Sequence, residues 1–314
     1  MKRQSLLGAP CYACPPSFHA PGDLCTFFGD FMARLRFGEV NDSDLEWAKG
    51  RHLSRLSSQE KALFSDAKTL FLVPKRADAH NLNLQRLQHF NQALQHSRGL
   101  QFAYCCPVRA RDVGKLPKSI HEDVGGLPSF SVFCRGSPVT LCCNIVLPFR
   151  LFNGAVGTVV DFVFPPNQGP MPDGSRHPLY ILVDFPDYSG PSLLPSSPTL
   201  VPVIPIEMHS FGCTRNGFPL KLSFCLTCHK AQGCTCGAGK TFERVCCNLG
   251  EGAVEQKWGH GLGFVALSRA TEGGRVALDG DVSLTRLRAM THGKYTFQMC
   301  VCVCVCVCVQ NTPV

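Results

Sequence analysis

Along the first third of the chain, the hydrophobic pattern alternates between helical and strand-like segments. Residues 27–36 have a helical period, and Asn41 or Asp42 can cap the helix that follows. Residues 69–73 form a short continuous apolar run, which is typical of a buried parallel strand. Residues 79–94 then repeat apolar positions on one helical stripe, made of Leu84, Leu87, Phe90 and Leu94. A buried strand followed by an amphipathic helix predicts an α/β fold.

The middle of the chain has the pattern of several short strands. Residues 139–146, 157–164 and 179–185 are rich in β-forming residues, and turn residues lie between them. One of these turns is Asn153-Gly154, which is most simply a tight hairpin. Short strands joined by hairpin signals predict a small β-barrel next to the α/β part.

Two apolar runs in the last third of the chain each end in polar residues. Residues 220–226 lead into a polar cluster that extends to Thr235, and residues 263–267 lead to Ser268 and Arg269. A buried strand followed by a helix brings polar groups to one edge of a sheet in this way. An arginine fixed there can bind a phosphate through two N–H donors, which a lysine does less well.

Composition narrows these possibilities only slightly. The chain has 314 residues, 45% hydrophobic and 17% charged, which indicates one or two globular domains and not a disordered chain. The net charge of +8 favours a polyanionic partner only mildly. No apolar run reaches the ~18 residues of a membrane-spanning helix, and the N-terminus lacks a secretory signal. We therefore expect an intracellular protein, nuclear or mitochondrial, without a membrane partner, whose 20 cysteines are thiols.

The two polar clusters resemble conserved blocks of Pif-like DNA helicases, the superfamily 1 branch that includes RecD-type enzymes and the helicases of Helitron transposons. Residues 218–235 resemble helicase motif V, and residues 265–269, Val-Ala-Leu-Ser-Arg, resemble motif VI. Weaker blocks extend the resemblance over about residues 27–278, and Asn81 falls where the family has an Asn. The resemblance covers the C-terminal half of such a helicase.

The resemblance implies an α/β fold, the second RecA-like domain of a helicase with an inserted small SH3-like β-barrel. It divides the chain into five parts: an unstructured leader (1–26), a helical lead-in with the first part of RecA-like domain 2A (27–127), the SH3-like 2B insert (128–212), the remainder of domain 2A (213–290), and a Val-Cys tail (291–314). The strict Val-Cys alternation of the tail is explained most simply as a translated dinucleotide repeat.

The resemblance also implies functional residues. Arg269 takes the place of the catalytic arginine that stabilises charge on a phosphoryl group. The implied nucleotide-binding residues are Gln232, Gly233, Ser268 and Arg269. The implied DNA-binding residues are Asn153, Thr227, His229, Lys230 and Thr235. The implied cofactors are ATP and Mg²⁺, the implied partner is single-stranded DNA, and no residue is assigned to metal binding. A surface arginine after a buried strand and a capped loop without a ligand remain the simpler alternatives.

Residues 237–241, Gly-Ala-Gly-Lys-Thr, imitate the end of a Walker A phosphate-binding loop. The first glycine of that motif is missing, since Cys234 stands in its place. A helix should also follow, whereas residues 242–249 have the pattern of a short strand. Residues 180–184 imitate a Walker B strand but precede this segment instead of following it. We therefore expect no working P-loop here.

Four cysteines near the motif V block offer another chemistry. Cys225, Cys228, Cys234 and Cys236 have a C-x₂-C-x₅-C-x-C spacing that could bind zinc. Cys225-x-x-Cys228-His229 also matches a c-type haem attachment signature, but haem attachment needs an export context that the sequence lacks.

A complete helicase motor needs a first RecA-like domain that holds ATP and Mg²⁺. In the family that domain precedes the position of Phe27, where this sequence has only 26 residues. We therefore expect a C-terminal fragment of an ATP-dependent 5′–3′ DNA helicase of replication, repair, recombination or transposition. We expect it to be inactive alone, to bind ATP poorly, and to depend on a partner chain for domain 1A. The alternatives are a non-enzymatic single-stranded DNA-binding module and a Cys-rich zinc protein.

Overall fold

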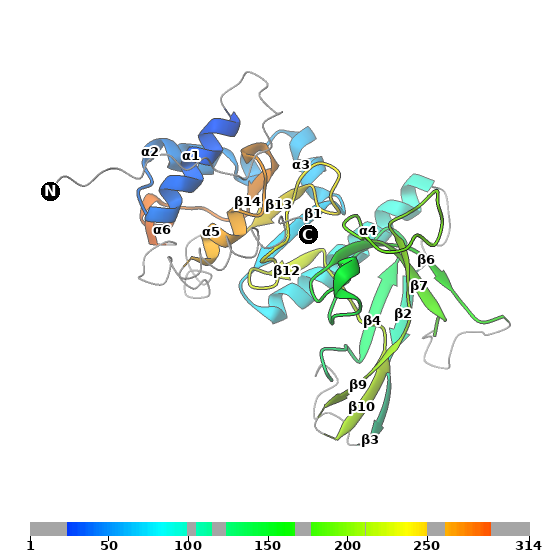
Figure 1. Ribbon diagram of the computed structural model, residues 1–314. Coiled ribbons are helices and arrows are strands. Elements are labelled where there is room, and N and C mark those ends of the chain that lie inside the picture. The colour runs from blue at the N-terminus through cyan, green and yellow to red at the C-terminus, as the bar shows by residue number, and fades with distance from the viewer. Residues whose placement is uncertain are drawn as a thin grey trace.

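The computed structural model describes residues 24–98, 105–114, 124–166, 177–210, 212–249 and 261–289. A parallel sheet with its helices forms one part, antiparallel strands form the other, and helix α4 runs between them (Figure 1). Residues 1–23 of the expected leader and the tail at 291–314 lie outside the described residues. The division of the chain into five parts stays a prediction.

The parallel sheet has the strand order β12-β1-β13-β14. Its strands are β1 (Thr69–Val73), β12 (Cys225–Thr227), β13 (Arg244–Cys247) and β14 (Val276–Leu278). The predicted strand at residues 69–73 is confirmed, and Leu70 and Leu72 are buried at 0% and 1% exposure. Polar groups that follow these strands therefore share the carboxyl edge of the sheet, as expected of an α/β domain.

Six α-helices are described: α1 (Leu24–Phe37), α2 (Asp42–Gly50), α3 (Ser58–Ser65), α4 (Arg76–Arg98), α5 (Leu262–Leu267) and α6 (Leu284–Ala289). The predicted cap of α2 is confirmed at Asn41, whose side chain accepts from Asp44 N at 3.1 Å. The Asp44 carboxylate accepts in return from Asn41 N at 3.0 Å, which completes a capping box. No described helix combines the length and the apolar character that a membrane crossing requires.

Two details of the predicted secondary structure are wrong. Leu84 was expected on the buried stripe of α4 but is 39% exposed, whereas Leu87 is buried. The apolar run at residues 263–267 was expected as a buried strand and is part of helix α5, in which all six residues are buried. A short apolar run fits a buried strand and a fully buried helix equally well, so the pattern alone did not decide between them.

Helix α4 supplies a neighbour for the outermost strand of the parallel sheet. Asn83 Nδ2 donates to the Cys225 carbonyl at 2.8 Å, and Cys225 N donates to Asn83 Oδ1 at 2.9 Å. The side-chain amide therefore satisfies both backbone groups of an edge-strand residue inside the protein, as a neighbouring peptide group would. Asn81, the residue that the family resemblance singled out, is exposed.

We expect Asn83→Ala to lower the free energy of unfolding by about 3 kcal/mol, because it leaves two buried backbone groups of Cys225 without a partner. Urea denaturation followed by circular dichroism measures the change. Asn81→Ala on the same helix is the matched control and should change stability by at most about 0.5 kcal/mol. Equal effects of the two substitutions would contradict the assigned role of Asn83.

The second sheet is antiparallel, with the order β11-β5-β6-β7-β8. Its strands are β5 (Pro138–Leu141), β6 (Val156–Val163), β7 (Tyr180–Asp184), β8 (Leu200–Val203) and β11 (Leu220–Leu222). The strands expected at 157–164 and 179–185 are confirmed, and only the first half of 139–146 is a strand. Among the described residues the sheet is open, since β8 and β11 do not pair into a barrel.

A narrower set of strands extends from this sheet (Figure 1). It consists of β2 (Cys105–Arg109) paired with β4 (Phe130–Cys134), and of β3 (Arg111–Gly114), β10 (Cys213–Gly217) and β9 (Ile206–Ser210). Arg215 of β10 is 1% exposed, and its guanidinium donates to the Asp112 carboxylate at 2.6 and 2.8 Å. It also donates to the Leu127 carbonyl at 3.0 Å, so one side chain connects two segments of this extension.

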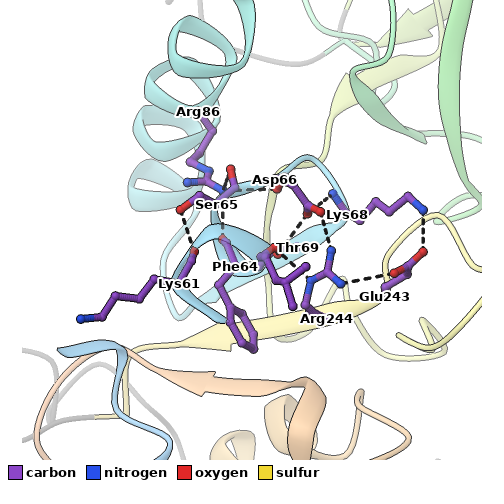
Figure 2. A network of polar contacts seen from close by, with 10 residues as sticks. Lys61, Phe64, Ser65, Asp66, Lys68, Thr69, Arg86, Glu243 and Arg244 are labelled. Atoms are coloured by element: carbon purple, nitrogen blue, oxygen red, sulfur yellow. Dashed lines mark hydrogen bonds and ion pairs between the residues drawn. The ribbon is translucent and has the colours of Figure 1, made fainter. Parts of the chain in front are cut away.

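At the amino end of the parallel sheet, two arginines cap the last turn of α3 (Figure 2). Arg244 Nε donates to the Leu63 carbonyl at 3.0 Å, and Arg86 Nη2 donates to the Ser65 carbonyl at 3.1 Å. Arg244 also forms an ion pair with Asp66. Carbonyls at a helix end lack partners within the helix, so this network has a structural explanation. The candidate functional residues lie at the other end of the sheet, beyond the carboxyl end of β12.

Candidate nucleotide and nucleic-acid site

A tight turn follows β12 and presents most of the predicted site residues. The Thr227 carbonyl accepts from Lys230 N at 2.9 Å and from Ala231 N at 3.0 Å, which reverses the chain within one turn. Gly233 has φ 87°, a left-handed conformation that favours glycine. Thr227 itself is 9% exposed. The exposed residues of the turn are His229, Lys230, Gln232, Gly233 and Thr235.

The side chain of Arg269 binds this turn from the end of α5. Arg269 Nη1 donates to the Ala231 carbonyl at 3.4 Å and to the Cys234 carbonyl at 3.2 Å. Its Nε donates to the Val265 carbonyl at 3.0 Å, and its Nη2 donates to Ser268 Oγ at 3.0 Å. The structure therefore brings the two sequence blocks together, although they are more than thirty residues apart.

The Arg269 guanidinium is buried without a carboxylate partner in the part of the chain that the structure describes. It is 6% exposed, and its described partners are three carbonyls and one hydroxyl. Burial lowers the pKa of Arg269, and the thiols of Cys234, Cys236 and Cys228 partly offset this effect. A buried cation that lacks a counter-ion costs free energy. The position is therefore suited to an anion, such as a phosphate oxygen.

The segment that imitates a Walker A motif is a surface loop. Cys236 N donates to the Arg269 carbonyl at 2.7 Å, and Lys240 Nζ forms an ion pair with Asp187 at 2.7 Å. Strand β13 follows the loop, as the sequence predicted for residues 242–249, and no helix begins there. In a P-loop, backbone N–H groups of the glycine-rich loop cradle the phosphates at the start of a helix, and the lysine there contacts them. Gly237–Thr241 therefore lacks the loop-to-helix geometry of a P-loop, and the expectation that it holds no nucleotide stays a prediction.

Asn153 lies on a different element from the turn. It is exposed in the turn before β6, where its N–H donates to Asn144 Oδ1 at 2.8 Å, and Gly154 follows with φ 107°. Val156, at the start of β6, packs against the core of the parallel sheet. The Lys240–Asp187 ion pair makes a second connection between the two parts. Asn153 therefore belongs to the antiparallel sheet, at the strand that borders the α/β part.

The four cysteines of the zinc alternative form no assembled metal site within the described ranges. These residues contain no group of three or more His, Cys, Asp or Glu side chains that could hold a metal ion. Cys225 and Cys228 are instead buried at 1% and 0% exposure. Burial raises the pKa of Cys228 to about 12, which opposes the thiolate that zinc requires.

Three features of this region were not anticipated from the sequence. They are the Asn83 amide on β12, the Lys240–Asp187 ion pair, and the contact between Arg269 and the carbonyl of Cys234. No local sequence pattern signals these contacts, and the sequence singles out Cys234 only as part of a possible zinc set.

The described geometry can be compared with known proteins. No protein-family model matches the sequence, and no curated protein matches it. Solved structures do match. A Pif1 helicase from Candida albicans is 21% identical with a TM-score of 0.57, over 89% of this chain and 58% of that chain. A Pif1 helicase from Bacteroides in complex with ADP-AlF₃ and single-stranded DNA is 16% identical with a TM-score of 0.53, over 87% of this chain and 52% of that chain.

These likenesses define a class of protein by its fold. Over most of its described length the chain has a mixed helix and sheet fold of the Pif1 helicase type, which confirms the resemblance seen in the sequence. The chain spans somewhat more than half the length of these two helicases.

Proposed function

We propose that this chain is the part of a Pif1-type DNA helicase that holds single-stranded DNA and supplies an arginine to ATP. The observation that carries the proposal is the Arg269 guanidinium, buried beside the turn after β12 without a described carboxylate partner. The neighbouring Pif1 structures contain ADP-AlF₃ or single-stranded DNA, which supports the same two ligands here. The inserted sheet then corresponds to the SH3-like element of the family.

Each group of residues has a distinct role in this proposal. Gln232, Gly233, Ser268 and Arg269 face the nucleotide, and the charge of Arg269 stabilises the negative charge that develops on a transferred phosphoryl group. ATP supplies that phosphoryl group, with Mg²⁺ as its counter-ion. Both are held mainly by a first RecA-like domain from another segment or chain, since Gly237–Thr241 does not have the geometry of a P-loop.

The DNA-facing residues favour a second, simpler function as a binding module for single-stranded DNA. His229, Lys230 and Thr235 are exposed on one turn, where they can contact phosphates and sugars, and Thr227 begins that turn. Asn153 contributes from the turn before β6, at the border of the antiparallel sheet. A module of this kind needs no ATP, so assays of DNA binding and of ATP hydrolysis distinguish the two functions.

We expect the chain to bind single-stranded DNA with an affinity that falls steeply as salt rises, because bound phosphates release counter-ions. Lys230→Ala should reduce the slope of log affinity against log salt by roughly 0.7, the value of one phosphate contact on a single strand. Fluorescence anisotropy with an oligothymidine measures the slope.

Lys49→Ala is the control, since the Lys49 side chain is 38% exposed and lies on α2, where it pairs with Glu46. It removes the same charge and should leave the slope unchanged. If both substitutions reduced the slope equally, binding would reflect net charge alone and the turn would not be the DNA site.

A further inference from the structure

Two thiols lie together beside the buried guanidinium. Cys234 is partly exposed and Cys236 is fully buried, and the two thiols lie on one turn, close enough for each to shift the pKa of the other. Both are free cysteines, separated only by Thr235. Arg269 donates to the carbonyl of Cys234 at 3.2 Å, so the same residue belongs to the pair and to the site of Arg269.

The charges around Cys234 favour its thiolate. The interaction with the Cys236 thiol lowers the pKa of the Cys234 thiol, and the positive charges of Arg269 and Lys240 act in the same direction, against burial and the negative charge of Asp187. The same interaction raises the pKa of Cys236, which stays the protonated partner. A thiolate beside a cation, with solvent access and a second thiol in contact, is the usual arrangement of an oxidisable cysteine.

Other described cysteines lack this combination. Cys228 is fully buried, and burial raises its pKa to about 12. Cys143 is partly exposed like Cys234, but burial raises its pKa and no cation offsets the effect. Cys143 is therefore a matched comparison, a thiol of similar exposure without the neighbouring charges.

We propose that Cys234 and Cys236 are a redox modification site, which peroxide oxidises to an intramolecular disulfide that loosens the hold of the turn on Arg269. The effect of the disulfide on Arg269 rests on the function proposed above. Formation of the disulfide depends only on the two thiols and their neighbours.

The reaction balances with hydrogen peroxide as the oxidant. The Cys234 thiolate attacks one peroxide oxygen, the O–O bond breaks, and the released hydroxide takes up a proton to leave as water. The product is a sulfenic acid on Cys234. Cys236 then attacks the sulfenic sulfur, an S–S bond forms, and a second water leaves. Two thiols are oxidised and one peroxide is reduced to two waters.

The backbone contacts indicate which end of the pair moves when the S–S bond forms. Cys236 is anchored on both sides, since its N–H donates to the Arg269 carbonyl at 2.7 Å and its carbonyl accepts from Thr271 N at 3.2 Å. Cys234 has one described bond to another backbone group, from its N–H to the Ala231 carbonyl at 3.0 Å, and its own carbonyl accepts from the Arg269 side chain. Closing the ring therefore displaces Cys234, and its carbonyl moves away from Arg269.

The test uses the full chain with its five tail cysteines, Cys300 to Cys308, replaced by serine. After limited treatment with hydrogen peroxide, peptide mapping by mass spectrometry should find the Cys234–Cys236 disulfide before any other oxidised cysteine. Cys236→Ser should stop the reaction at a sulfenic acid on Cys234, which dimedone traps. Cys143→Ser should leave disulfide formation unchanged. Oxidation of Cys143 as fast as Cys234, or pairing of Cys234 with another cysteine, would overturn the site.

A second readout tests the link to Arg269 separately. Phenylglyoxal modifies accessible guanidinium groups, and Arg269 is 6% exposed in the reduced protein. Oxidised protein should show at least a several-fold faster modification of Arg269, while that of Arg215, 1% exposed and distant in sequence, stays slow. An unchanged rate at Arg269 would overturn the link while leaving the disulfide intact. Neither readout uses DNA or ATP, so a failure of the redox site is distinguishable from a failure of the proposed helicase function.

Discussion

Replacing Arg215 with methionine lowers the free energy of unfolding by about 3–5 kcal/mol, the cost of breaking a buried ion pair at one end. Arg215 is 1% exposed, and the side chain of Asp112 is 17% exposed. Without the guanidinium, the carboxylate of Asp112 and the carbonyl of Leu127 lose their donors. Methionine keeps most of the volume, so a cavity contributes little to the loss. Urea denaturation of the purified protein measures it.

Arg135→Met is the matched control for this prediction. Arg135 pairs with Asp161, but the two side chains are 63% and 40% exposed, so solvent screens the pair. We expect a loss of less than about 1 kcal/mol there. Combining Arg215→Met with Asp112→Leu should recover part of the stability, because no buried charge is then left alone. Similar losses at Arg215 and Arg135 would mean that the buried pair contributes no more than a surface pair.

Features that depend on neighbouring residues could be predicted from the sequence. Strand β1 follows from a continuous apolar run, and the capping box of α2 follows from Asn41 and Asp44 three residues apart. Helix α5 could not be predicted, since six consecutive buried residues carry no period that separates helix from strand. Asn81 and Asn83 are equivalent by pattern, and only the packing of α4 against β12 places Asn83 on the Cys225 backbone.

The contact between the two sequence blocks was predictable, but the electrostatics around Arg269 were not. Two sequence blocks predicted that Arg269 and the turn after β12 belong to one site, and the structure brings them into contact. The burial of Arg269 and its thiol neighbours were not predicted, because they result from contacts between Cys234, Cys236 and α5 that no local pattern encodes. The assigned roles of the individual residues stay predictions.

The two buried arginines differ in how their charge is compensated within the protein. Arg215 has a carboxylate on two of its nitrogens, so its charge is compensated within the protein. Arg269 has only carbonyls and a hydroxyl among the described groups, so its charge remains available to an anion. Functional sites can retain features that lower stability, so this contrast supports the role proposed above for Arg269.

The largest effect is therefore expected at Arg269 when a nucleotide domain is present. The isolated 314-residue chain should release no phosphate from ATP, with or without DNA, in a malachite-green assay. A fusion polypeptide that places the ATP-binding RecA-like domain of a Pif1 helicase before residue 27 should hydrolyse ATP when DNA is added. In that fusion, Arg269→Met should lower kcat by about 10³-fold or more, the contribution of a positioned arginine in phosphoryl transfer.

The changes in kcat and KM show whether the lost interaction acts in the transition state or in substrate binding. An interaction made mainly in the transition state lowers kcat and kcat/KM together, whereas a ground-state contact raises KM. Arg269→Lys keeps the charge but loses the planar pair of donors, so we expect it to recover only part of the rate. Arg275→Met, a few residues further on, removes an arginine that pairs with Glu272 and should leave kcat within about twofold. If Arg269→Met and Arg275→Met had the same small effect on kcat, the result would contradict a catalytic role of Arg269. Arg269 would then act only by holding the turn after β12.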